Sequence, residues 1–153
     1  MRLNETSILG TIRNQKRFIL HLVNSDQDLQ VRSRSERNLY ETSSGRLLMA
    51  FMTDKERAGL LNSIGYPTPD TWPGADTAEG LTTQLAIIRA DELCITRSAT
   101  HIMGLAVPIR QQQQVVASLS VFLPEIRCSP QRQHQIVTEL QAVAGEINHR
   151  LLI

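Results

Sequence analysis

Hydrophobic positions alternate with small or polar ones in three consecutive segments between Glu92 and Leu123, a period typical of β-strands. Two earlier segments, Thr6 to Ile12 and Arg17 to Val23, show the same period on either side of a short turn. In the second of them apolar side chains fall on both faces, so we expect both faces to be covered. A weaker strand is expected over Asp28 to Arg32, followed by a polar loop over Ser33 to Asn38.

Four segments carry apolar residues at helical spacing. The first is predicted to begin at Thr42 or Ser43, where hydroxyl side chains suit an N-cap. The second is expected to be capped by Asp54 and to end at Gly65, and the Pro- and Gly-rich stretch that follows predicts a loop as far as residue 74.

A third helix is expected from Asp76, and a last one from Ser129 as N-cap with Pro130 in the first turn. Gly145 inside the last helix costs about 1 kcal/mol relative to Ala, which predicts close packing against a neighbour. The element order is therefore ββ(β)αααβββα. Strands joined by short turns pair antiparallel, so the sequence predicts one α+β domain over residues 1–153 and not a parallel Rossmann-type sheet.

The last two strands place small residues on one face of the predicted sheet. A pairing of Ile109 with Val115 across their turn puts Ala106 opposite Ser118. The face of small residues then consists of Gly104, Ala106, Ser118 and Ser120, with Phe122 at its end. Such a face leaves space beside the sheet that either a closely packed helix or a small molecule fills, and the pattern leaves both readings open.

The first predicted helix begins with Ser43, Ser44 and Gly45. Free backbone N–H groups and the positive end of the helix dipole make a helix start a natural site for a carboxylate or phosphate. Gly45 would allow a ligand to approach the backbone closely. Every helix has such an end, so this feature alone does not define a site.

Composition excludes several classes of protein. The net charge is +1, with 16 basic against 15 acidic residues, so the general basic excess of a nucleic-acid-binding protein is missing. The locally basic segment from Arg32 to Arg37 is interpreted as a solvated loop. No apolar run approaches the roughly 18 residues of a membrane span, and the first residues lack the apolar core of a secretory signal. The two cysteines, Cys94 and Cys128, fit the reducing cytoplasm, which we predict as the location.

Catalytic chemistry finds little support in the residues. The four histidines form no metal-ligand spacing, and no phosphate-binding glycine loop is present, so we predict neither a metal nor a cofactor. Cys94 has the chemistry of a nucleophile, but no base is tied to it by the sequence. We therefore predict that the chain is not an enzyme, and an enzyme using Cys94 is the weakest alternative.

Several segments together resemble the effector-binding domain of the isocitrate lyase regulator (IclR) family of bacterial transcription factors. The first strand, the first helix start, the end of the third helix, the last hairpin and the closing helix all resemble the corresponding family motifs. These segments are Asn4 to Thr6 (NET), Tyr40 to Phe51 (YETSSGRLLMAF), Leu85 to Arg89 (LAIIR), Gly104 to Val121 (GLAVPIRQQQQVVASLSV) and Ser129 to Leu151. The resemblance covers nearly the whole chain.

The resemblance implies a GAF-like antiparallel sheet flanked by helices, and a role in sensing a small organic or sugar-derived acid. In this family the ligand touches the helix start, the last hairpin and a neighbouring strand. The matching positions here are Ser43, Ser44, Gly45, Ser120, Gly104 and either Cys94 or Thr96. The resemblance also implies a homo-dimer or tetramer, with operator binding by an N-terminal winged helix-turn-helix domain that these 153 residues do not contain.

Departures from the family pattern bear on the ligand. The stretch from Ile95 to His101 has no carboxylate where the family has an acidic run, and the last hairpin lacks the family's turn glycine. Gly104 stands where some members have Cys, and Phe122 where they have a second Ser. We therefore expect a roomier and more apolar site that binds an acid larger than two carbons. The rival interpretation is a ligand-free dimerisation module in which protein fills this space.

Overall fold

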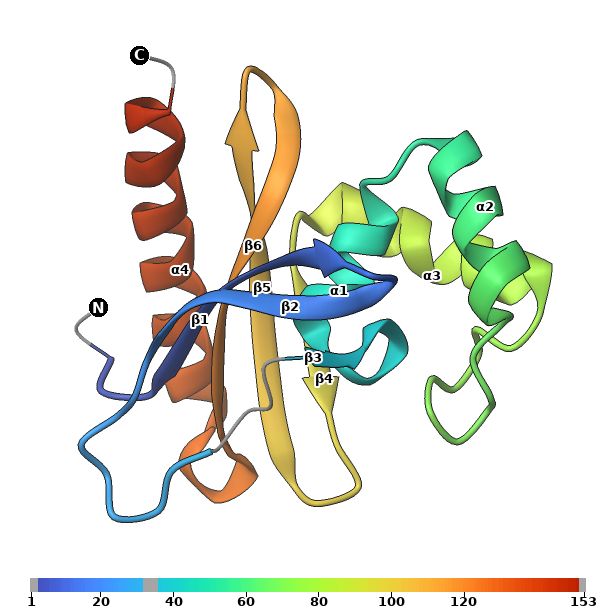
Figure 1. Cartoon of the computed structure of the whole chain (residues 1–153). Helices are drawn as coiled ribbons and strands as arrows, with labels where there is room; N and C mark the ends of the chain where they lie inside the picture. Colours follow the sequence, from blue (N-terminus) through green and yellow to red (C-terminus); the bar gives the residue numbers. More distant parts are fainter. Residues whose placement is uncertain (1–2, 32–35, 152–153) are drawn as a thin grey trace.

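In a computed structural model that describes residues 3–31 and 36–151, a six-stranded sheet separates helix α4 from the other helices (Figure 1). The strands are β1 (Thr6–Arg13), β2 (Lys16–Val23), β3 (Glu36–Asn38), β4 (Cys94–Arg97), β5 (Ile102–Gln111) and β6 (Gln114–Pro124). The helices are α1 (Ser43–Ala50), α2 (Asp54–Ile64), α3 (Ala78–Asp91) and α4 (Pro130–Arg150). This order confirms the predicted α+β class and the sequence ββ(β)αααβββα.

The sheet has the order β3-β2-β1-β6-β5-β4, and every neighbouring pair is antiparallel. Strands β1 and β6, which are far apart in the sequence, pair at the centre of the sheet, with Ile8 opposite Ser120. Two-residue turns close both long hairpins, and their central residues all have positive φ (52° and 64° at Asn14 and Gln15, 52° and 69° at Gln112 and Gln113). Positive φ at both positions is the type I′ geometry that matches the twist of the flanking strands.

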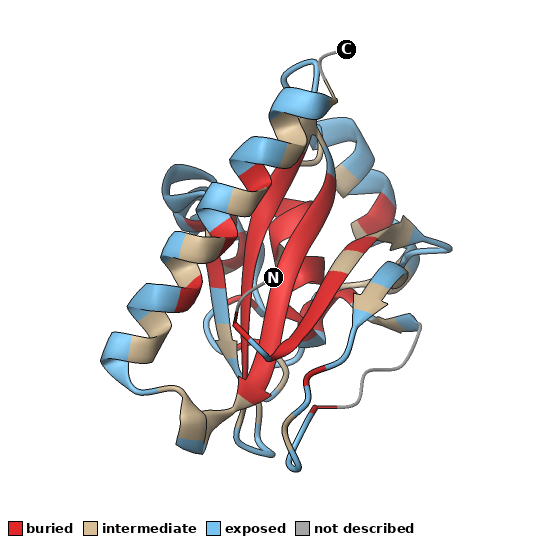
Figure 2. Cartoon of the chain, turned by 90° about the vertical axis from the view of Figure 1, so that its left-hand side faces the viewer, coloured by how far each residue is buried: buried red, intermediate tan, exposed pale blue. Residues whose placement is uncertain are grey.

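The two faces of the sheet bury different clusters. On the α4 face, large apolar residues of β5 and β6 pack against the inner side of α4, whose outer side is exposed (Figure 2). On the opposite face, α1 packs against β4 and β5, and α3 packs against α1, around Leu47, Leu85 and Ala106. We call this second surface the α1 face. Within the described ranges, no helix combines the length and apolar character that crossing a membrane requires.

The third strand lies elsewhere than predicted. Asp28 to Val31 forms no strand, so that prediction was wrong, and Arg32 to Ser35 lies outside the described residues. Strand β3 instead occupies Glu36–Asn38, inside the predicted loop, and pairs with the first three residues of β2. Backbone pairing at a sheet edge does not need alternating apolar side chains, which is why the hydrophobic pattern did not predict this strand.

Strand β2 is not covered on both faces, contrary to the prediction. Leu20 is 55% exposed and Val23 is 48% exposed. Helix α4 packs on β5 and β6 and only borders β2, where His21 and Val23 line an open hollow together with Val143 and Ile147 of α4. The apolar residues of this strand therefore lie partly at the surface.

The register of the β5–β6 hairpin differs by two residues from the assumed one. Ala106 lies opposite Ser120, and Gly104 lies opposite Phe122. An irregularity between Ile109 and Arg110, together with the two-residue turn, produces the shift. Because the shift is even, every side chain keeps its predicted face. The predicted face of small residues is therefore confirmed, and it is the α1 face.

The helix starts agree with the prediction to within two residues, the largest difference being α3, which was expected from Asp76 and begins at Ala78. The N-caps of α2 and α3 are Thr53 and Thr77, and not the aspartates beside them. Gly65 ends α2 with φ of 76°, and the Ser129 hydroxyl accepts the N–H of Arg132 at 3.1 Å, both as predicted. A threonine hydroxyl caps as well as a carboxylate, so neighbouring Thr and Asp residues could not be ranked from the sequence.

Two of the glycines in helices, Gly45 and Gly145, have opposite environments. A Cβ at Gly145 would meet no atom within 4 Å, so the prediction of close packing there was wrong. A Cβ at Gly45 would lie 2.3 Å from the carbonyl oxygen of Leu39. The 3₁₀ turn at Leu39–Glu41 therefore packs against α1 only because position 45 has no side chain.

These environments predict opposite effects for the same substitution. Gly45→Ala should lower the free energy of unfolding by about 1–3 kcal/mol, because the methyl group overlaps backbone atoms. Gly145→Ala should raise it by about 0.5–1 kcal/mol through helix propensity alone. Urea unfolding of the two variants and the parent chain measures both changes, and equal effects at the two sites would contradict this packing.

Candidate functional site

The start of α1 lies buried against the sheet. Ser43 and Ser44 have no exposed surface, and the Thr42 hydroxyl caps the helix by accepting the N–H of Gly45 at 2.9 Å. Ser44 Oγ donates to Thr42 Oγ1 at 3.5 Å. The N–H of Gly45 is thus already used, and its missing side chain is explained by Leu39. Of the predicted helix-start residues, Ser43 has a hydroxyl with no hydrogen-bond partner among the described residues.

Gly104 is the point where the predicted site residues meet. A Cβ built on Gly104 would lie 2.8 Å from each of three atoms, which belong to three different elements. These atoms are Ser43 Oγ of α1, Thr96 Oγ1 of β4 and Cε1 of Phe122 in β6. Residues far apart in the sequence therefore converge over one glycine, and any side chain at position 104 would displace them.

The two predicted serines of β6 are both fully buried on the α1 face. Ser120 Oγ donates to the carbonyl oxygen of Ile8 at 3.4 Å. Ser118 Oγ, like that of Ser43, has no hydrogen-bond partner among the described residues. A buried hydroxyl without a partner costs on the order of 1–3 kcal/mol, so two of them on one face call for an explanation.

Cys94 and Ala106 lie opposite each other on β4 and β5, to one side of the Gly104 contact. Both belong to the apolar cluster under α1 and α3, and Cys94 also borders a surface hollow of about 230 Å³ beside Trp72. Burial raises the pKa of the Cys94 thiol to about 12, an effect that the nearby Arg46 only partly opposes. At neutral pH this thiol is protonated and is a poor nucleophile.

The space over Gly104 is closed in this structure. Ser43, Ala106 and Ser120 have no exposed surface, and the three side-chain atoms above Gly104 are packed tightly around it. The structure thus brings Ser43, Thr96 and Phe122 onto Gly104 and leaves no room above this glycine for a ligand atom. Their role in ligand binding stays a prediction.

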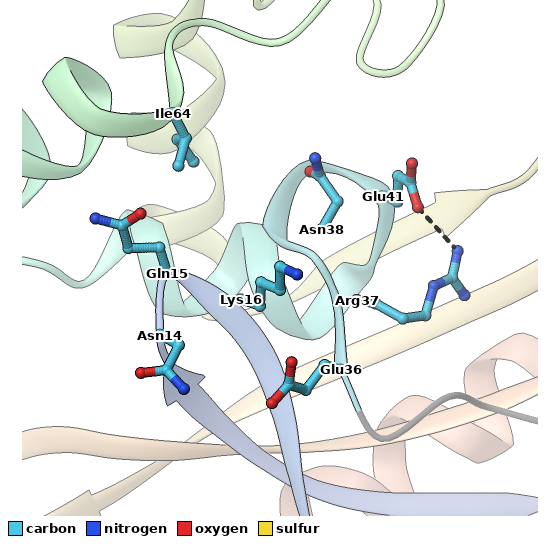
Figure 3. A pocket seen from close by; sticks show the side chains of 8 residues that line it. All are labelled: Asn14, Gln15, Lys16, Glu36, Arg37, Asn38, Glu41 and Ile64. Carbon is cyan, nitrogen blue, oxygen red and sulfur yellow. Dashed lines mark hydrogen bonds and ion pairs between the residues drawn. The ribbon is translucent and has the colours of Figure 1, made fainter.

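An open hollow of about 600 Å³ lies at the β3 end of the sheet (Figure 3). It is lined by Asn14, Gln15, Lys16, Glu36, Arg37, Asn38, Glu41 and Ile64. Arg37 points toward Glu41, with 3.5 Å between its Nη2 and the carboxylate oxygen. The lining is almost entirely polar and pairs two cations with two anions, so the hollow has no net charge to attract an acid. The sequence analysis did not predict it.

The burial of Arg17 was also not predicted from the sequence. Its side chain is fully buried on the α1 face, because Arg17 pairs with Ile12 of β1 and Ile12 packs against the cluster under α1. Burial, and secondarily the positive charge of Arg37, lower the pKa of Arg17 to about 10. The alternation along β2 could have predicted the face on which Arg17 lies, because Arg17 is two residues before Ile19 and so shares its face.

A six-stranded antiparallel sheet with α1, backed by α3, on one face and α4 on the other is the arrangement of a GAF-like domain. The family model described as bacterial transcriptional regulator IclR C-terminal matches residues 1–149. The chain therefore belongs to the IclR family and is its C-terminal, effector-binding domain. This is a family of transcriptional regulators and not of enzymes, which agrees with the prediction.

Known proteins support the same assignment. The chain is 26% identical over 152 residues to the HTH-type transcriptional regulator KdgR of Dickeya chrysanthemi, a match that covers 96% of this chain and 50% of KdgR. A transcriptional regulator from Rhodococcus sp. RHA1 superposes with a TM-score of 0.84 at 22% identity, over 98% of this chain and 62% of that one. An IclR homolog from Microbacterium hydrocarbonoxydans, complexed with 4-hydroxybenzoate, superposes with a TM-score of 0.80 at 23% identity. This match covers 98% of this chain and 62% of that one.

The chain thus spans about half the length of the curated relative and about three fifths of these two solved structures. At these identities, the structural similarity establishes the fold and not the ligand.

The environment of the cysteines gives a direct prediction. With a pKa of about 12, roughly one Cys94 in ten thousand is a thiolate at pH 8, so iodoacetamide should leave it unmodified in the native chain. Cys128 is less buried and should react first, although burial raises its pKa as well. Mass spectrometry of the labelled chain, with the urea-unfolded chain as control, tests the order. Selective labelling of native Cys94 would revive the enzyme interpretation.

Proposed function

We propose that this domain senses a small organic acid, aromatic or sugar-derived, bound between the start of α1 and the β5–β6 hairpin. The observation that carries the proposal is the pair of buried hydroxyls, Ser43 and Ser118, that have no partner among the described residues. Ser43 lies in α1 and Ser118 lies on the α1 face of β6, so both hydroxyls lie between the helix and the sheet. A ligand with oxygen atoms at both ends would supply the missing hydrogen bonds.

The shape of the surrounding residues supports an acid with an apolar body. Gly104 and Ala106, which have little or no side chain, form one wall of the proposed site, and the ring of Phe122 lies beside Gly104. The Microbacterium relative complexed with 4-hydroxybenzoate makes an aromatic acid a suitable first choice here. The remaining predicted residues, Ser44, Gly45, Cys94, Thr96 and Ser120, would then line or support the site.

Binding in this proposal requires a conformational change. The three atoms over Gly104 lie too close to leave room for a ligand, so Phe122 must rotate or α1 must move away from the sheet. A ligand that binds only the opened arrangement shifts the population toward it. We propose that this shift alters a homo-dimer or tetramer of the domain. It would thereby change operator binding by a DNA-binding domain outside these 153 residues.

A second candidate function is a ligand-free dimerisation module. The closed packing over Gly104 favours it, because protein already fills the space. It also agrees with the partly exposed apolar side chains of Leu20 and Val23 on β2. A chain that dimerises in solution and binds none of the acids named below would support this function instead.

The sensor proposal predicts a specific effect of Ser43→Ala. The melting temperature without ligand should not fall, because the hydroxyl has no hydrogen bond to lose among the described residues. Affinity for the acid should fall about fivefold, the value of one hydrogen bond. Thermal shift against 4-hydroxybenzoate, 3-hydroxybenzoate, gluconate and pyruvate measures both quantities.

Matched variants sharpen this experiment. Ser63→Ala removes an exposed hydroxyl from α2 and should leave binding unchanged. Ser120→Leu places a large side chain in the proposed site and should abolish ligand-induced stabilisation. Unchanged stabilisation in Ser120→Leu would remove Ser120 from the site, and no stabilisation of the parent chain by any of the four acids would contradict the sensor proposal.

A further inference from the structure

The buried arginine Arg17 lies beside one of the partnerless hydroxyls. A Cβ built on Gly10 would be 3.4 Å from Cδ of Arg17 and 3.5 Å from Oγ of Ser118. The arginine stem and the serine hydroxyl therefore lie over the same glycine of β1, on the α1 face. Gly10 has no side chain to separate them, so the stem of Arg17 from β2 and the hydroxyl of Ser118 from β6 meet across β1.

A second cation lies close to Arg17 among the described residues. Arg37 lies directly opposite Arg17 on β3, so the two guanidinium groups share a face. Like charges in opposed positions of an antiparallel pair repel each other. Glu41 offsets part of the charge of Arg37, from which it lies 3.5 Å away. Because the side chain of Arg37 is 32% exposed, water weakens this ion pair. The lowered pKa of Arg17 agrees with surroundings that disfavour its positive charge.

A guanidinium group can accept an anion in addition to its existing contacts. It presents five N–H donors in a planar fork, and two of them match the two oxygens of a carboxylate. Lysine, with a compact ammonium group, does not reproduce this geometry. The Ser118 hydroxyl adds a further donor on the same side.

We infer that Arg17, together with Ser118, binds the carboxylate of the effector. The inference rests on the proposed function and deepens it, because it moves the acid group from the start of α1 to the β1–β2 side of the same face. Ser118 and Ser120 are two residues apart on β6, about 7 Å along the strand. An acid anchored at Arg17 can therefore direct its body past Ser120 toward Phe122.

In this proposal an acid reaches Arg17 from the β3 end of the sheet. Arg37 is opposite Arg17 across the β2–β3 pair and also lines the open hollow of about 600 Å³ (Figure 3). Movement of the Arg37 side chain away from Glu41 would expose the neighbouring arginine to that hollow. The hollow then serves as the entrance to the site and not as the site.

The experiment compares an acid with its neutral amide on the 153-residue chain. The probes are 4-hydroxybenzoate with 4-hydroxybenzamide, and gluconate with gluconamide, measured by calorimetric titration. Arg17→Gln should weaken binding of the acid about 10- to 100-fold and leave the amide unchanged, so the preference for the acid disappears. Arg13→Gln, which alters an arginine stacked on Phe18 on the α4 face, is the control and should keep the preference.

A second variant keeps the test decisive if Arg17→Gln does not fold. Arg17→Lys retains the charge and should bind the acid about tenfold more weakly, because the bidentate contact is lost. An Arg17→Gln variant that keeps the preference for the acid, or an Arg17→Lys variant with parental affinity, overturns the inference and leaves the proposed function standing. If the parent chain binds neither acid, the inference and the proposed function fail together.

Discussion

Helix α1 lies so close to the 3₁₀ turn and to the sheet that one position on each side of these contacts, Gly45 and Gly104, has no room for a side chain. A methyl group at Gly45 would overlap the backbone of Leu39, and one at Gly104 would press on Ser43, Thr96 and Phe122 at 2.8 Å. This approach fixes where the 3₁₀ turn, α1 and strands β4 to β6 sit relative to one another. It also determines which side chains are enclosed between helix and sheet.

The enclosed layer contains more polar groups than a purely structural core needs. Ser43, Ser118, Ser120 and Arg17 are all fully buried on the α1 face. Leu, Val and Ile fill the α4 face, where β5 and β6 meet α4. Buried polar groups cost free energy unless they are satisfied, and the hydroxyls of Ser43 and Ser118 have no hydrogen-bond partner among the described residues, which is the basis for proposing a polar ligand in this layer. The family assignment is consistent with this explanation, because IclR regulators carry their effector site in this domain.

Local patterns in the sequence predicted much of this arrangement. The face of small residues was predicted because alternation along β5 and β6 survives an even error in register. Strand β3 and the burial of Arg17 were not predicted, since both depend on pairing with residues distant in the chain. Sequence periodicity placed Gly104 and Phe122 on one face, whereas Ser43 and Thr96 were grouped with Gly104 only through the family resemblance; the structure shows the contact of both with this glycine.

The central claim is that an acid binds between α1 and the β5–β6 hairpin. Nuclear magnetic resonance of the ¹⁵N-labelled chain tests it most directly, by titration with the acid that raises the melting temperature most. If the acid binds there, the largest amide shifts occur at Ser43, Gly104 and Ser120. Shifts confined to the open hollow, at 14–16 and 36–38, would contradict it.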